Sequence, residues 1–310
     1  MSTSVRVGTE STATLGGRRE TLISRIARQT GRMGLLFPAV ALMAVFLIGP
    51  IAYSVYGSLT NAALSGYKAA NPEFVGLENY VELLTSNAFW KAVLLTVIFV
   101  FASAVVGQNI LGLALAMLMR KAPKILSTLV GGVVVIAWVM PEIVAAFALY
   151  AFFSTDGTLN VLLSYIGLGG TTWLLTFPMF SVIMANIWRG TAFSMMVYSA
   201  ALAEVPPEIQ EAAKVDGARG WQRFFFVTLP MIKGSISTNL LLTTLQTLGV
   251  FTLLWVMTGG GPGTQSTTLP VMAYQEAFKN SLIGYGTAIA TVTIVLGALF
   301  ALVYIRALKP

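Results

Sequence analysis

Hydrophobic residues along the chain fall into six long runs, separated by shorter stretches that hold most of the charged residues. The runs cover residues 34–59, 88–119, 125–153, 177–203, 232–257 and 283–307. Each run is long enough for a transmembrane helix, which needs about 20 predominantly apolar residues to cross a hydrocarbon core of about 30 Å. The pattern therefore predicts an all-α integral membrane protein with six transmembrane helices.

Composition supports a membrane location. Of the 310 residues, 56% are hydrophobic and 10% are charged, whereas about 25% of the residues of an average soluble domain are charged. Residues 1–33 differ because they are rich in Ser, Thr, Gly and Arg. We expect this basic tail to be disordered or to lie on the membrane surface. Residues 34–310 then form a single six-helix transmembrane domain.

The positions of Lys and Arg predict the orientation of the chain. Of 19 basic residues, six lie in the N-terminal tail, three at residues 120–124, four at residues 204–233 and two at the C-terminus. These fifteen fall on one side of the predicted helices, three fall on the other side, and Arg189 lies within a run. The positive-inside rule places both termini and the stretch 204–233 in the cytoplasm. The net charge of +7 thus reflects topology, and the basic tail lacks the interleaved aromatic residues of a nucleic-acid site.

The sequence excludes several kinds of chemistry. It contains no cysteine and no histidine, which removes thiol nucleophiles, disulfides, imidazole catalysis and histidine-based metal sites. It also lacks the G-x-x-x-x-G-K-[ST] loop that binds nucleotide phosphates. We therefore predict a chain that is not an enzyme, with no catalytic residues, no metal site and no cofactor of its own.

The stretch 204–233 is a polar segment between two long hydrophobic runs. It contains eight charged residues, so it must face water or a soluble partner. Pro207 suits the first position of a helix, and Gly217 suits a left-handed position at its end. A second short helix can run from about Trp221 to Val227. The stretch is predicted to form two short helices joined at a glycine.

The same stretch resembles a motif of ABC importer permeases, which has E-A-A, three residues, G, nine residues and I-x-L-P. The matching residues, with Val227 in place of the usual Ile, are Glu211, Ala212, Ala213, Gly217, Val227, Leu229 and Pro230. The resemblance implies a type I importer permease fold, with this loop forming cytoplasmic coupling helices. It implies that the loop docks in a groove of a separate ATPase dimer, which holds ATP and Mg.

Glu142 follows Pro141 inside the third hydrophobic run. An ionisable residue within a membrane span is a candidate functional residue, and a proline there breaks the helical hydrogen bonding. Two alternatives stay open. Glu142 has a role in transport, or it lies near the outer mouth or pairs with a neighbouring subunit.

The fourth run contains N-I-W-R-G-T-A-F, which resembles the W-x-G-x-x-[FY] pattern that lies beside the sugar pathway in maltose-type permeases. The resemblance places Arg189, Gly190 and Phe193 on the pathway. Gly190 would let the helix loosen there so that backbone groups reach a ligand. Ala192 departs from the proline that is frequent in this pattern, and ordinary packing between helices is the alternative interpretation.

The fifth run carries several polar residues. Thr243, Gln246, Thr247 and Val250 have the spacing i, i+3, i+4, i+7, which places them on one helix face. In maltose-type permeases the corresponding positions contact sugar, and hydroxyl and amide groups suit a neutral polyol. These residues either line the pathway or hydrogen-bond to neighbouring helices.

The resemblance as a whole implies a permease subunit of a carbohydrate ABC importer, a multi-pass protein of the bacterial plasma (inner) membrane. Its implied partners are a second permease subunit, the ATPase dimer, an external solute-binding protein, the lipid bilayer and the carbohydrate substrate. The loop that contains T-G-G-G-P, residues 258–262, resembles an outward loop where a binding protein would dock. The alternatives are an ion-coupled secondary transporter and an ABC permease for a non-carbohydrate solute.

Overall fold

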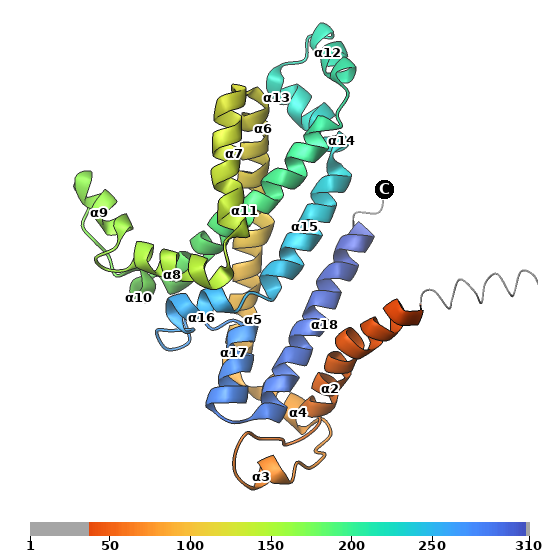
Figure 1. Cartoon of the computed structure of the whole chain (residues 1–310), viewed down its shortest axis with the longest axis vertical. Coiled ribbons are helices and arrows are strands. Elements are labelled where there is room, and N and C mark those ends of the chain that lie inside the picture. The colour runs from red at the N-terminus through yellow and green to blue at the C-terminus, as the bar shows by residue number, and fades with distance from the viewer. Residues whose placement is uncertain (1–36, 308–310) are drawn as a thin grey trace, which may run out of the picture. The chain divides into compact units, whose positions relative to one another are not determined.

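The computed structural model of the chain describes residues 37–307 (Figure 1). The chain divides into two units between Tyr53 and Ser54. All regular elements of the described residues are helices, and an isolated β-bridge joins Thr60 to Phe74. The predicted basic tail, residues 1–33, lies outside the described part of the chain.

The first hydrophobic run forms a helix over Phe37–Ser58 that is long and apolar enough to cross a membrane. It includes the π-helical segment η1 (Ala44–Ile48) and the α-helix α2 (Gly49–Ser58). The prediction of a helix over the first run is confirmed.

The second run forms a continuous helix of 35 residues, Asn87–Lys121. It consists of α5 (Asn87–Phe99), the π-helical segment η2 (Val100–Gln108) and α6 (Asn109–Lys121). At 1.5 Å per residue the helix is about 52 Å long, which exceeds a hydrocarbon core of about 30 Å. Its ends must therefore project beyond the core.

The third run is not one helix. It forms α7 (Lys124–Val139) and α8 (Glu142–Phe153), and α8 turns away from the direction of α7 (Figure 1). Between them Met140 adopts an extended conformation with ψ of 132°, because a residue before a proline is disfavoured in the helical region. The prediction of one transmembrane helix over residues 125–153 is wrong at this point.

The fourth run forms α11 (Pro178–Ala203), a continuous helix of 26 residues. The fifth run is interrupted again, because α15 (Lys233–Leu248) ends at Gly249 and α16 (Thr252–Thr258) begins after Phe251. The sixth run is one helix, α18 (Ile283–Ala307). The remaining short elements outside the stretch 204–233 are α3 (Tyr67–Ala70), α4 (Glu78–Thr85), α9 (Thr158–Tyr165), α10 (Trp173–Thr176), α17 (Leu269–Tyr274) and η4 (Gln275–Lys279).

Four helices of the described residues are long and apolar enough to cross a membrane, and a fifth is added if a pair bent by 70° counts as one span. The four are Phe37–Ser58, Asn87–Lys121, Glu142–Tyr165 and Ile283–Arg306, and the bent pair is Gly220–Met231 with Lys233–Leu248. The all-α membrane fold is confirmed. The predicted count of six is not reproduced, because two runs are broken and α11 carries many polar residues.

α11 packs against η2, α6, α7 and α15 in the second unit. One contact with α6 is so close that a Cβ atom on Gly112 would lie 2.4 Å from Cβ of Ser194 and 2.9 Å from the backbone N of Met195. Only glycine fits such a contact without moving the backbone. α11, which carries three of the predicted pathway residues, is thus packed closely against α6.

Candidate coupling loop and translocation pathway

The stretch 204–233 folds into short helices at the same end of the second unit as the C-terminus of α6 and the N-terminus of α15 (Figure 1). The first is α12 (Pro207–Val215), which begins at the predicted proline. It is followed by α13 (Gly220–Arg223), η3 (Phe224–Thr228) and α14 (Leu229–Met231). The prediction of two short helical segments on either side of Gly217 is confirmed.

Gly217 forms the turn between these segments with a φ of +79°. Its N–H donates to the carbonyl of Lys214 at 3.1 Å, and the N–H of Ala218 donates to the carbonyl of Ala213 at 3.0 Å. These bonds satisfy carbonyl groups at the end of α12. A Cβ atom at Gly217 would meet no atom within 4 Å, so only the left-handed backbone conformation demands glycine here.

The face of α12 that carries Glu208, Glu211 and Lys214 is exposed. Gln210 is half-buried, and its Nε2 donates to Oγ1 of Thr228 on η3 at 2.8 Å. Among the other motif residues, Ala213 and Leu229 are half-buried, and Ala212 and Pro230 are exposed. The loop is therefore fixed internally and presents a charged helix face outward, as a docking element requires.

A second group of polar residues is buried where η2 and α6 cross α11 and α15. Its centre is Asn239 of α15, whose Nδ2 donates to Oδ1 of Asn109 at 2.8 Å and to Oγ of Ser194 at 2.9 Å. The hydroxyl of Tyr198 also donates to Oδ1 of Asn109. On α11, Nδ2 of Asn186 donates to Oγ of Ser103 at 2.8 Å.

These amides were not among the predicted site residues. Asn109, Asn186 and Asn239 each stand inside a hydrophobic run, which is the available sequence signal. Buried polar groups need partners, so an amide within each of three runs indicates that those three helices contact one another. We call this group, Ser103, Asn109, Asn186, Ser194, Tyr198 and Asn239, the amide cluster.

The four residues predicted to share one face of α15 have different surroundings in the structure. Thr243 and Thr247 are buried beside the amide cluster, where they accept from Nδ2 of Asn109 at 3.4 Å and of Asn186 at 3.3 Å. Gln246 is exposed on the surface of the chain, and Val250 packs against a hydrophobic core. Hydrogen bonding between helices, one of the two interpretations left open, describes the two threonines in this structure. A pathway role for any of the four stays a prediction.

The expected loosening of α11 at Gly190 is wrong for this structure, because α11 is continuous from Pro178 to Ala203. A Cβ atom at Gly190 would lie 2.2 Å from Cδ of Gln108. The buried Gln108 donates through Nε2 to the carbonyl of Asn186 at 3.0 Å. The absence of a side chain at Gly190 therefore leaves room for the side chain of Gln108. The position of Gly190 on a pathway stays a prediction.

The other two predicted residues of α11 are Phe193 and Arg189. The ring of Phe193 packs against Trp138 of α7, with centroids 5.9 Å apart. Arg189 is half-buried, and its Nε is buried without a hydrogen-bond partner among the described residues. Phe193 thus contacts α7 in this structure.

Glu142 has a partner within the chain. It is half-buried at the start of α8, and its Oε1 accepts from the backbone N–H of Leu253 at 3.2 Å. Leu253 lies in the first turn of α16, where free N–H groups favour an anion. The carboxylate therefore links the starts of two helices, each of which follows a break in a hydrophobic run.

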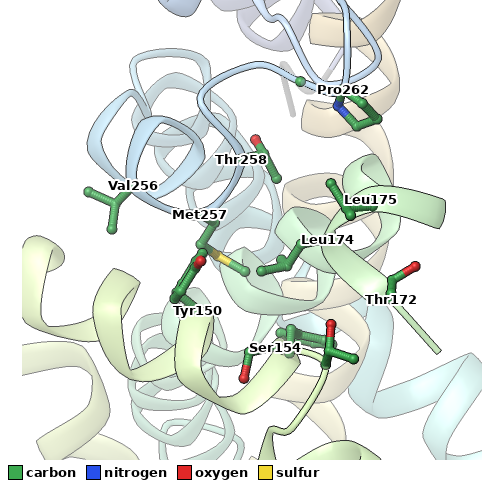
Figure 2. A pocket seen from close by; sticks show the side chains of 12 residues that line it. Tyr150, Ser154, Thr172, Leu174, Leu175, Val256, Met257, Thr258 and Pro262 are labelled. Atoms are coloured by element: carbon green, nitrogen blue, oxygen red, sulfur yellow. The ribbon is translucent and has the colours of Figure 1, made fainter. Parts of the chain in front are cut away.

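A cavity of about 430 Å³ lies beside α8, α10 and α16, away from the coupling loop. It is lined by residues of α8, α10 and α16 and by Gly261 and Pro262 of the glycine-rich loop. Figure 2 shows Tyr150, Leu174 and Met257 lying together at its centre, with the hydroxyls of Ser154 and Thr172 nearby. The glycine-rich loop contains residues 258–262, for which we predicted an outward position.

The fold defines an α-helical membrane protein whose apolar helices are joined by an exposed, charged helical loop. Residues 108–310 match the model of the family described as binding-protein-dependent transport system inner membrane component. The chain is 31% identical over 290 residues to the trehalose/maltose transport system permease protein MalF of Thermococcus litoralis, covering 92% of this chain and 96% of the relative. It is 33% identical to the sulfoquinovosyl glycerol transport system permease protein SmoG of Agrobacterium fabrum, covering 89% of each.

A solved structure agrees in fold. A chain of a bacterial alginate ABC transporter, crystallised with an alginate pentasaccharide-bound periplasmic protein, superposes with a TM-score of 0.76 at 24% identity, covering 92% of this chain and 96% of that chain. The present chain belongs to the family of binding-protein-dependent transport system inner membrane components. It is a membrane-embedded permease subunit of an ABC importer, in which ATP hydrolysis belongs to a separate subunit.

Proposed function

We propose that this chain is one permease subunit of a carbohydrate importer, with its coupling loop and both termini in the cytoplasm. It pairs with a second permease subunit, an ATPase dimer that binds ATP and Mg, and an external solute-binding protein. One observation supports the substrate class. The relatives named above transport trehalose, maltose or sulfoquinovosyl glycerol, all of which are glycosides.

The observation that carries the proposal is the geometry of the coupling loop. α12 exposes Glu208 and Glu211 while Gln210 holds it to η3. Charged side chains on a helix that projects from the ends of apolar spans indicate a soluble protein partner. Because fifteen of nineteen basic residues fall on the side of this loop, that partner is cytoplasmic. An ATPase that docks there can transmit closure of its dimer to α11 and α15.

Family membership sets aside the ion-coupled secondary transporter. The hydrogen bond from Leu253 to Glu142 adds to this, because it gives the carboxylate a structural role at the start of α16. An ABC permease for a non-carbohydrate solute is the remaining alternative. It would be supported if the binding protein that stimulates the complex bound an amino acid or an ion instead of a glycoside.

The turn at Gly217 offers a sharp test of coupling. Gly217→Ala places a side chain on a left-handed residue, which costs about 1–2 kcal/mol, or a factor of roughly 5–30 in the population of the native loop. Gly220→Ala is the matched control, because neither glycine has a neighbour within 4 Å and only Gly217 has a positive φ. Both variants are assembled with their partners in proteoliposomes, and ATP-dependent uptake of the carbohydrate is measured.

We expect Gly217→Ala to lower uptake and binding-protein-stimulated ATP hydrolysis, while Gly220→Ala keeps both. Equal uptake by the two variants would contradict the docking of this loop on the ATPase. Arg189→Ala extends the test to the predicted pathway. Loss of uptake with normal assembly would support a pathway role, and failed assembly would make Arg189 a structural residue.

A further inference from the structure

A cavity beside the coupling loop has no part in the proposed docking. Its volume is about 600 Å³, and its walls come from the ends of α6 and α11 and from α12, α13 and η3. Its location between the loop and the ends of the spans places it at the level of the membrane surface, because α6 and α11 leave the hydrocarbon core there. A ligand in it would contact both the loop and the lipid boundary.

Positive charge is concentrated around this cavity. Arg120, Lys121 and Arg223 line it, and no acidic residue does. Arg120 and Lys121 lie in the last turn of α6, where cations interact favourably with the helix dipole. Their presence is therefore explained in part by the helix itself.

Arg223 is not explained in that way. Its Nε is buried and has no hydrogen-bond partner among the described residues. A buried donor without a partner is costly, and a guanidinium is shaped to bind two oxygens of a carboxylate or phosphate. The cavity therefore lacks an acceptor that carries negative charge.

The remaining walls are apolar and aromatic. Met117 and Leu202 continue the cavity toward the hydrophobic spans, and Trp221 lies at its edge with 57% of its surface exposed. Exposed tryptophan beside basic residues is typical of the interface between membrane and water. A ligand that fits must therefore combine an anionic group with a hydrocarbon chain.

We infer that this cavity binds an anionic phospholipid, with its phosphate at Arg223 and an acyl chain along Met117 and Leu202. Basic pockets between transmembrane helices on the cytoplasmic side bind acidic headgroups in this way. An acidic segment of the ATPase fits less well, since the apolar walls would stay uncovered and the exposed face of α12 is the separate docking surface. The inference rests on the proposed cytoplasmic position of the loop.

Trp221 provides a direct test in the assembled complex. The complex is placed in nanodiscs of phosphatidylcholine. Increasing amounts of one of two lipids, phosphatidylglycerol or phosphatidylcholine, each brominated in its acyl chains, are then added. Tryptophan fluorescence is measured at each step. The contribution of Trp221 is the difference between the unmodified complex and the Trp221→Phe variant. Trp188→Phe is the matched control, because Trp188 of α11 is exposed but does not line the cavity.

We expect the phosphatidylglycerol to quench Trp221 at about a tenfold lower mole fraction than the phosphatidylcholine, since each basic residue near the surface contributes to binding of acidic lipid. Arg223→Gln should remove most of this difference. Lys124→Gln should keep the difference between the two lipids. Lys124 lies three residues after Lys121, at the start of α7, but does not line the cavity. Quenching of Trp188 should not depend on the headgroup.

Equal quenching of Trp221 by the two lipids in the unmodified complex would overturn the inference without requiring any charge variant to fold. Weaker retention of the ATPase by Arg223→Gln, with lipid quenching unchanged, would instead assign the cavity to an acidic ATPase segment and also overturn it. The result of this lipid experiment can be distinguished from the result of the uptake experiment that tests the proposed function. Lipid selectivity at Trp221 does not depend on ATP-driven uptake, and uptake lost in Gly217→Ala does not depend on lipid selectivity.

Discussion

The amide cluster places polar residues inside apolar runs and the coupling loop places them between two runs, and the two regions use these residues in opposite ways. In the amide cluster, Asn109, Asn186 and Asn239 are buried and hydrogen-bonded to residues of other helices. In the coupling loop, Glu208 and Glu211 are exposed. The comparison teaches that burial, more than polarity, separates side chains that hold the chain together from side chains available to another protein.

The largest expected effect on stability is at the crossing of α6 and α11, beside the amide cluster. Gly112→Ala would bring Cβ to 2.4 Å from Cβ of Ser194 and 2.9 Å from the backbone of Met195. Such overpacking typically costs about 1–3 kcal/mol. We expect a lower melting temperature and a smaller monodisperse fraction of the purified complex.

Gly132→Ala is the control for this substitution. Gly132 lies on α7 with no neighbour within 4 Å of an added Cβ, and glycine is less favourable than alanine in a helix by about 0.8–1.0 kcal/mol. The control should keep or raise the melting temperature. Equal destabilisation by both substitutions would show that the close contact at Gly112 is not what matters.

A somewhat smaller effect is expected from Asn239→Leu within the amide cluster. The substitution removes the donor to Asn109 and Ser194, and hydrogen bonds between membrane helices contribute about 0.6 to 2 kcal/mol. Thermal unfolding of the complex measures the loss. Thr238→Val, on the exposed neighbour of Asn239, should unfold like the unmodified chain. If both variants behave alike, the cluster does not stabilise the fold.

Glu142→Gln should have a smaller effect still. The amide oxygen can accept from Leu253, but the negative charge at the start of α16 is lost, which typically costs about 0.3–1 kcal/mol. We expect a slight decrease in melting temperature and normal uptake. A large loss of uptake with an unchanged melting temperature would assign Glu142 a role in transport beyond the link between α8 and α16.

Gln246→Leu should change stability least, because Gln246 is exposed on the chain. If its side chain lines the pathway, uptake should fall several-fold, in line with about 1–3 kcal/mol for an unpaired polar partner. Thr247→Val, by contrast, should lower both stability and uptake, because Thr247 is buried against Asn186. Unchanged uptake by Gln246→Leu at normal expression would remove this face of α15 from the pathway.

Much of the fold followed from local sequence features. Runs of apolar residues gave the membrane class, Pro207 gave the start of α12, and Gly217 gave its end, because each of these depends on the chain close by. The break between α7 and α8, at Met140 and Pro141, also has a local cause, since a proline removes a helical hydrogen bond. The break between Gly249 and Phe251 has no proline, so its position depends on contacts with other helices.

The candidate pathway was less predictable for the same reason. The spacing of Thr243, Gln246 and Thr247 shows that they share one side of a helix, but it does not show which neighbouring helix covers part of that side. The structure supplies that information by placing Asn109 and Asn186 against the threonines. Gly190 illustrates the same limit, because sequence suggests flexibility where the structure shows a contact with Gln108.

The unbroken helix Asn87–Lys121 runs between the glycine-rich loop and the coupling loop. Near its start, Nζ of Lys91 donates to Oγ1 of Thr264, and Oγ1 of Thr96 accepts from the N–H of Leu269, both at 2.9 Å. At its other end Lys121 lines the cavity under the coupling loop. The 30 residues from Lys91 to Lys121 span about 45 Å. In the proposed orientation this one continuous helix joins the two faces of the membrane, so we expect a displacement at the cavity under the coupling loop to be transmitted along it to the glycine-rich loop.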